Sequence, residues 1–247
     1  MRKILLLSTF LFALLTTAQG QGFAFGLKGG MTAGFQQWNN FERDPLLTWH
    51  AIAFIETLTE DNAFSLFAQG GFHNRGSAVR IRAFTFVDPN TGGNRRFSGN
   101  TTRYEFYNVS LSAGGKQKFL MSNETTSYYY LIGIRGDYNL GTNLDDLSGT
   151  NVAFNSPFFP QDPFVRDFTF GLILGGGLEF EFQELFGGLL EVTLNPDFTK
   201  QYEQLPIPNV YNPFTMQNQT LSETIVRNVT VEISLGIRFI NRVEYID

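Results

Sequence analysis

The chain has two histidines, His50 and His73, and imidazole is a common metal ligand and proton carrier near neutral pH. If the segments around them pair as strands joined by a tight turn, with Thr59 opposite Phe64, the same register places His50 opposite His73. Two imidazoles across a strand pair could hold Zn or Cu. No cysteine and no nearby acidic residue completes such a site. The sequence therefore predicts polar residues near a rim, with no metal and no cofactor.

A hydrolase would need a nucleophile, a base and an orienting group in contact. Ser65 and Ser77 lie near His73 in the sequence, which a chain rich in serine and threonine also produces by chance. Glu179 and Glu181 face the same way in a strand, as residues of an internal salt-bridge row would. We therefore expect no catalytic residues and no enzymatic activity.

The elements that position these residues are strands, because apolar and polar residues alternate along much of the chain. In "NVTVEISLGIRF" the apolar row from Val229 to Phe239 alternates with a polar row that includes Glu232 and Arg238. The eight expected strands cover 23–35, 49–58, 64–75, 103–116, 128–138, 168–182, 189–195 and 228–239. The pattern predicts an all-β protein.

The first residues have the pattern of a secretory signal peptide. Arg2 and Lys3 precede an apolar run from Ile4 to Leu15, and small residues follow, with cleavage expected after Ala18. The run is shorter than the roughly 20 residues that a spanning helix needs. We expect residues 1–18 to be removed and residues 19–247 to form one β-barrel domain.

Charge and cysteine content exclude several classes of partner and site. Without residues 1–18 the chain has 16 Lys and Arg against 23 Asp and Glu, a net charge of −7. This balance argues against nucleic acid or anionic lipid as an electrostatic partner. The absence of cysteine excludes disulfides and thiolate metal sites.

The links between the expected strands alternate between short and long. "TEDN" and two other short links alternate with long stretches, the longest of them near 76–102, 140–165 and 196–223. Short turns on one side and long loops on the other are typical of outer-membrane barrels, with the turns in the periplasm. The sequence thus predicts an eight-stranded antiparallel up-and-down transmembrane β-barrel in the bacterial outer membrane, in contact with its lipid.

An eight-stranded barrel has an interior just wide enough to be filled by side chains. We expect a plugged lumen in which inward charged residues pair with one another. Glycines on the inward rows, Gly171, Gly175 and Gly177, would make room for long Arg and Glu neighbours. The expected lumen network comprises Lys28, Glu56, Arg135, Asp137, Glu191, Glu232 and Arg238, together with Lys116, Glu179 and Glu181.

Several stretches resemble the strands of the PorT-type, OmpA-like outer-membrane β-barrel family. They are "GFAFGLKGGMTAG", "HAIAFIETLTEDNAFSLFAQGGFHNRGS", "FTFGLILGGGLEF" and "VEISLGIRF", and they span most of the chain in order. Thr169, Gln69 and the pair Val109-Ser110 stand where the family often has Asp, Glu and Ile-Pro. The resemblance implies a barrel and, for some members, an accessory role in type IX secretion and gliding.

Three functions remain open at this point. The first is a barrel with a plugged lumen and a structural or interaction role in the cell envelope. The second is an accessory component of a type IX secretion or gliding complex, with other envelope proteins as partners. The third is a narrow channel or small-ligand transporter.

Overall fold

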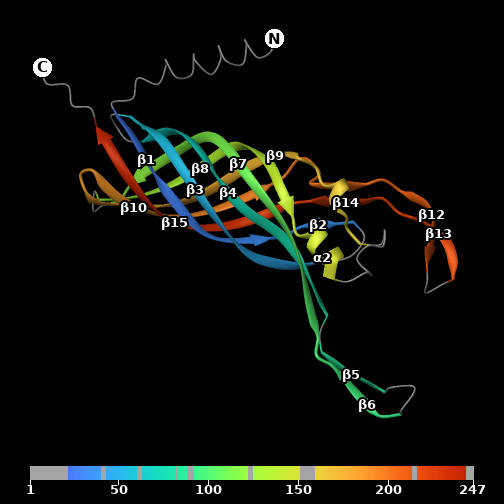
Figure 1. Cartoon of the computed structure of the whole chain (residues 1–247). Coiled ribbons are helices and arrows are strands. Elements are labelled where there is room, and N and C mark those ends of the chain that lie inside the picture. Colours follow the sequence, from blue (N-terminus) through green and yellow to red (C-terminus); the bar gives the residue numbers. More distant parts are fainter. Residues whose placement is uncertain are drawn as a thin grey trace, which may run out of the picture.

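In the computed structural model, eight long strands close into one antiparallel barrel (Figure 1). The structure describes residues 22–39, 43–59, 63–81, 83–87, 92–121, 125–150, 159–212 and 216–242. The barrel strands are β1 (Gly22–Gly34), β3 (Asp44–Leu58), β4 (Phe64–Ile81), β7 (Asn100–Leu120), β8 (Thr126–Thr142), β9 (Phe168–Gln183), β10 (Phe186–Pro196) and β15 (Val229–Arg242).

Each barrel strand pairs with its neighbour along the chain, and β1 closes the barrel by pairing with both β3 and β15. The first strand begins where the last one ends, since Gly22 faces Arg242. The predicted eight-stranded antiparallel architecture is confirmed. Because successive side chains in a strand point to opposite faces, every strand carries one row outward and one row into the lumen.

The alternation of link lengths is also confirmed. The links 59–63, 121–125 and 184–185 join strands at one end of the barrel, which we call the turn end. The links 35–43, 82–99, 143–167 and 197–228 lie at the opposite end, the loop end. In outer-membrane barrels the short turns are periplasmic and the long loops extracellular.

The long links contain more regular structure than the sequence predicts. One holds β2 (Gln37–Trp38), another the hairpin of β5 (Phe84–Val87) and β6 (Asn94–Phe97), and a third holds the helices α2 (Leu144–Thr150) and η2 (Asp162–Phe164). The last link forms β11 (Tyr202–Gln204), β12 (Ile207–Asn212), β13 (Gln217–Leu221) and β14 (Thr224–Arg227). Strands β11, β14 and β2 form a small sheet, although β2 is far away in the sequence.

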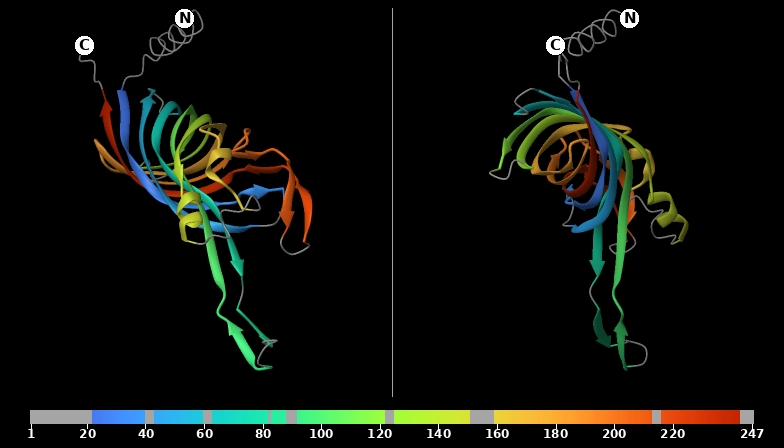
Figure 2. Two further views of the ribbon diagram at one scale, coloured as in Figure 1. Left: turned by 45° about the vertical axis from the view of Figure 1, so that its right-hand side comes forward. Right: turned by 90° about the vertical axis from the view of Figure 1, so that its left-hand side faces the viewer.

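Two expected strands are much longer than the sequence predicts. The third was expected to end near Arg75 and the fourth to begin at Arg103, but β4 continues to Ile81 and β7 starts at Asn100. The ladder continues because the two strands leave the barrel as a hairpin, which projects away from the turn end (Figure 2). Beyond the membrane neither face needs an apolar row, so the alternation that predicted the strands disappears there.

Three expectations concern the ends of the chain and helical segments. The expected signal peptide lies outside the described residues, and so do the last residues of the chain. The last strand continues past Phe239 to Arg242. Within the described ranges no helix has the length and apolarity needed to cross a membrane.

Candidate functional site

The lumen near the turn end holds a cluster of buried ion pairs. The Glu56 carboxylate on β3 accepts hydrogen bonds from Lys116 Nζ at 2.6 Å and from Arg238 Nη2 at 2.5 Å. The Glu179 carboxylate on β9 accepts hydrogen bonds from the same two cations, at 2.8 Å from Lys116 Nζ and at 2.6 Å from Arg238 Nη1. Lys118 Nζ lies 3.1 Å from an oxygen of each carboxylate. Two carboxylates thus join cations from β7 and β15 across the barrel, so the cluster ties together strands that do not all pair directly.

A second pair extends this cluster toward the middle of the barrel. Lys28 Nζ on β1 donates to Glu191 Oε1 on β10 at 2.5 Å, and Tyr129 Oη on β8 donates to Glu191 Oε2 at 2.8 Å. Lys116 also lies over the Tyr129 ring, 4.2 Å from its centroid. Both oxygens of Glu191 are therefore satisfied without water.

Nearer the loop end, the lumen holds a second ionic cluster. Arg75 Nη1 on β4 donates to Asp137 Oδ2 at 2.8 Å, and Arg135 Nε donates to the same oxygen at 2.9 Å. Arg135 also pairs with Asp197, which follows β10, and Ser110 donates to Asp137. Arg75 is fully buried. A buried charge is tolerated only when it is paired and hydrogen-bonded, as these are.

The two histidines lie between the clusters. His50 faces His73 across β3 and β4, as the sequence predicts, and the rings stack with centroids 5.7 Å apart. His50 Nδ1 lies 2.9 Å from Thr32 Oγ1 and its Nε2 lies 2.8 Å from Ser234 Oγ. The expectation that no acidic residue lies near the histidines is wrong. Glu232 is distant in the sequence, but its Oε1 lies 2.8 Å from His73 Nδ1 in the folded barrel. Glu232 is on β15, which closure of the barrel brings across from β4.

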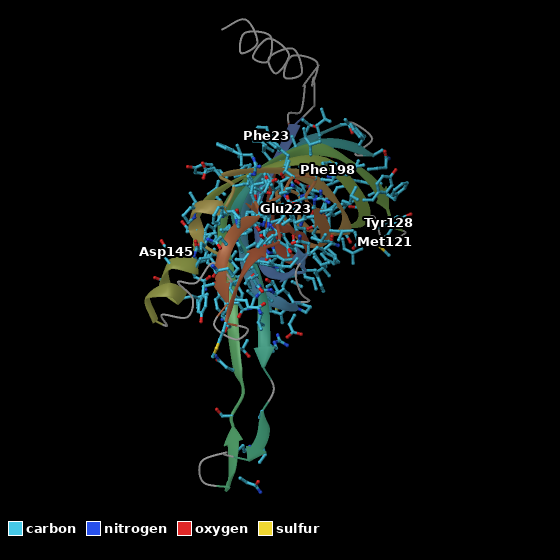
Figure 3. All side chains as sticks on the ribbon, turned by 90° about the vertical axis from the view of Figure 1, so that its right-hand side faces the viewer. Phe23, Met121, Tyr128, Asp145, Phe198 and Glu223 are labelled. Atoms are coloured by element: carbon cyan, nitrogen blue, oxygen red, sulfur yellow. The ribbon has the colours of Figure 1, made fainter. Side chains whose placement is uncertain are left out.

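The structure thus places all seven residues of the expected lumen network inside the barrel. Among the described residues the buried cations and anions are equal in number, with Lys28, Arg75, Lys116, Lys118, Arg135 and Arg238 against Glu56, Asp137, Glu179, Glu191, Asp197 and Glu232. Glu181, also expected in the network, is only half-buried near the turn end. Figure 3 shows how side chains fill the space within the ribbon. Two voids among these side chains have volumes of about 10 Å³ each, room for one water molecule at most.

Sequence reasoning missed four members of the clusters, although each lies on an inward row that was already identified. Arg75 continues the row of His73, Lys118 that of Lys116, and Asp197 that of Glu191. Tyr129 lies inward between two outward tyrosines. Alternation therefore contained the signal for the face of each residue. Arg75 and Tyr129 lie within the expected strands, and only the rows of Lys118 and Asp197 had to be extended past the expected strand ends.

The reason expected for the inward glycines is wrong. A Cβ atom on Gly177 would lie 2.7 Å from Tyr129 Oη, and one on Gly175 would lie 2.8 Å from Thr193 Cγ2. Carbonyl oxygens of the paired strand lie even closer, that of Leu190 to the first Cβ and that of Val192, at 2.5 Å, to the second. The space is thus needed by the neighbouring backbone, a tyrosine and a threonine rather than by long Arg and Glu side chains. At Gly171 the nearest side-chain atom is Asp197 Oδ1, at 3.1 Å. Gly177 in particular allows Tyr129 to reach Glu191.

At the loop end, segments far apart in the sequence pack over the barrel mouth. The Arg43 guanidinium lies between the rings of Trp38 and Tyr104, 4.1 Å and 4.4 Å from their centroids. The Trp38 ring also packs near Tyr202, with centroids 5.9 Å apart. Burial raises the pKa of Tyr202 to about 12, so its phenol stays protonated at neutral pH. These contacts involve β2, β7 and β11, and they cover the lumen from the loop side.

Polar contacts continue this cover down to the lumen. Ser77 Oγ donates to Gln36 Oε1 at 2.6 Å, and Gln36 Nε2 donates to Gln201 Oε1 at 3.1 Å. Asn228 donates to both Gln201 and Asp197. The cover and the outer ionic cluster are therefore one hydrogen-bonded network.

The outer wall of the barrel is apolar and carries two aromatic bands. Near the loop end the rings of Trp49 and Phe72 lie 5.0 Å apart, and near the turn end those of Phe119 and Tyr128 lie 5.0 Å apart. Between the bands the outward residues are mostly exposed leucine, isoleucine, valine and alanine. From Tyr128 to Tyr138 β8 covers about 33 Å along the strand, which a tilt of 35–45° reduces to about 25 Å. This height matches the apolar band of a membrane barrel.

A closed barrel with an apolar outer wall, two aromatic bands and a polar interior is a transmembrane β-barrel of the outer-membrane type. These features place the chain in the bacterial outer membrane. Within the described part of the chain no group of three or more His, Asp or Glu side chains has the arrangement of a metal site.

Comparisons with known proteins give matches at the level of structure only. The sequence matches no protein-family model and no curated protein. Among solved structures, the outer membrane protein OprG from Pseudomonas aeruginosa is 10% identical, with 91% of this chain and 99% of that chain covered and a TM-score of 0.49. Neisserial surface protein A is 10% identical, with coverage of 87% and 97% and a TM-score of 0.44. The outer membrane protease OmpT from Escherichia coli is 9% identical, with coverage of 90% and 98% and a TM-score of 0.36. The class assigned above rests on the barrel itself.

Proposed function

We propose that this chain is an outer-membrane barrel whose lumen is closed, and that it has a structural or interaction role at the cell surface rather than a transport or enzymatic one. The observation that carries the proposal is the pairing inside the barrel. Each of the six buried cations lies within 4 Å of a carboxylate oxygen, and the voids between them hold one water molecule at most. A permeating ion would have to displace these partners.

The surface available for interaction is therefore at the loop end. Two hairpins lie there, one formed by β5 and β6 and the other by β12 and β13. Figure 2 shows the first of them projecting away from the barrel. Barrel rigidity below and extended hairpins above are suited to presenting a binding surface outside the cell.

Planar-bilayer recording tests the closed lumen. We expect folded protein, verified by a heat-modifiable shift on gels, to give no steady conductance over a range of voltages, because the lumen charges are paired and the mouth is covered. An open porin inserted in the same bilayers is the positive control. A reproducible ohmic conductance from the folded protein would contradict closure and would favour the narrow channel.

A role in type IX secretion or gliding is the second candidate. What favours it is the residue resemblance to the PorT-type family, whose matching stretches form β1, the β3–β4 hairpin, β9 and β15. Loss of secretion after deletion of the gene, together with co-purification of other envelope subunits, would support this role. Normal secretion in the deletion strain would count against it.

A further inference from the structure

The hairpin that projects from the loop end has an unusual charge. It comprises the outer parts of β4 and β7 with β5 and β6, and we call the described residues 78–81, 83–87 and 92–103 the arm. The described residues of the arm include Arg80, Arg95, Arg96 and Arg103 and no Asp or Glu. Elsewhere at the loop end Arg166 and Lys200 both pair with Glu203, so a neighbouring acid offsets their charge.

The acidic helix α2 of the loop end lies beside the base of the arm. Asp145 and Asp146 are exposed on α2. Figure 3 shows Asp145 to one side of the barrel. Glu105 lies 3.1 Å from Arg103 Nε at the base of the arm. Leu144 of α2 packs beside Tyr104 and Val79 at the same base, so the described acids meet the arm only there, and the described residues farther out include none.

The arrangement of the cations is linear. Arg80 faces Thr101 and Arg103 faces Ala78, so the two arginines are diagonal neighbours on one face, about 7 Å apart. Arg96 lies up to about 23 Å farther along the chain from Arg103, at 3.3 Å per residue. Both Arg80 and Arg96 are exposed, and the Arg103 side chain is about half exposed. Charges spread along a rod match a ligand with repeated charges better than a single phosphate.

Backbone contacts fix the guanidinium groups at the base of the arm. Arg80 Nη2 donates to the Pro45 carbonyl at 3.3 Å, and Arg103 Nη2 donates to the Leu47 carbonyl at 3.4 Å. Each group keeps further N–H donors, because a guanidinium has five. Every cation of the arm is arginine, whose planar donor fork binds sulfate, phosphate and carboxylate groups in a bidentate way.

From this geometry we propose that the arm binds a linear anionic polysaccharide outside the cell. Threonine and asparagine lie beside the arginines, with Thr85 opposite Arg96 and Thr101 opposite Arg80, and their polar groups can hydrogen-bond sugar hydroxyls. Figure 2 shows the outer part of the arm, with β5 and β6, projecting away from the barrel. The inference rests on the proposed orientation, with the loop end outside the cell.

Binding of the full-length folded protein in detergent to immobilised dextran sulfate, over a series of salt concentrations, tests the proposal. We expect binding that weakens steeply with salt, and none to neutral dextran, because release of counterions drives such association. The variant with Arg80→Gln, Arg96→Gln and Arg103→Gln should bind at least about tenfold more weakly. The control variant with Arg166→Gln, Lys200→Gln and Arg227→Gln also removes three positive charges from the loop end, and its affinity should stay within about twofold.

Three results would overturn the proposal. One is absence of binding by the wild-type protein, and another is an equal loss in the two triple variants. The third is equally tight binding to poly-L-glutamate, which would indicate an acidic protein partner. A protein that is heat-modifiable and non-conducting but does not bind dextran sulfate would refute the polysaccharide ligand alone and leave the closed barrel standing.

Discussion

Replacing Glu56 with glutamine lowers the free energy of unfolding by about 3–5 kcal/mol, the usual effect of breaking a buried ion pair. Glu56 is 1% exposed and accepts hydrogen bonds from Lys116, Lys118 and Arg238. The neutral amide keeps the shape of the side chain but leaves three cations to share Glu179. Urea unfolding of the protein in lipid vesicles, followed by tryptophan fluorescence, measures the change.

Two further variants separate the ionic effect from a general effect of losing a carboxylate. Glu184→Gln, in the exposed turn between β9 and β10, should change stability by less than about 0.5 kcal/mol. Adding Lys118→Gln to Glu56→Gln removes one of the three cations left to share Glu179. The double variant should therefore be about 1–3 kcal/mol more stable than the sum of the two single effects predicts. A Glu56→Gln variant as stable as the wild-type protein would show that the cluster contributes nothing to stability.

Placing a charge on the outer wall has a comparable effect. Leu235 lies in the middle of β15, is 68% exposed and belongs to the outward row. Leu235→Arg should destabilise the barrel in lipid by about 2–4 kcal/mol, because the guanidinium would lie near the bilayer midplane. The same vesicle unfolding experiment measures this value.

The matched control places the same charge outside the apolar band. Asn218 is exposed on β13, in the β12–β13 hairpin, and Asn218→Arg should change stability by less than about 0.5 kcal/mol. Equal stability of the Leu235→Arg and wild-type proteins in lipid would mean that this face of β15 does not contact the bilayer.

Alternation in the sequence predicts the barrel because each wall strand separates lipid from a polar lumen. The same alternation correctly assigns Glu232 and Arg238 to the inward row of β15. It also assigns Arg75, and it would have assigned Asp197 had the row of Glu191 been extended. The partners of these residues could not be predicted. Contacts such as His73 with Glu232, 159 residues apart, depend on barrel closure and on how far each side chain reaches across the lumen.

The structure of the long links was the least predictable part. Strand β2 pairs with β14 from the other end of the chain, and neither has an alternating pattern long enough to be recognised. The basic charge of the arm was not predicted, for another reason. Net charge averages over the whole chain, so a balance of −7 argues against anionic partners even though one projecting hairpin is strongly basic.

The outward row of β15 faces lipid and its inward row faces a packed lumen, and spin labels along β15 test this arrangement most directly. The chain has no cysteine, so single cysteines can be placed at Ile233, Leu235 and Ile237 on the outward row and at Ser234 on the inward row. In lipid vesicles we predict that oxygen, which is concentrated in the bilayer, reaches the outward labels, and that neither oxygen nor a water-soluble nickel chelate reaches the inward one. High nickel accessibility at Ser234 would reveal a water-filled pore, and high nickel accessibility on the outward row would contradict the membrane barrel.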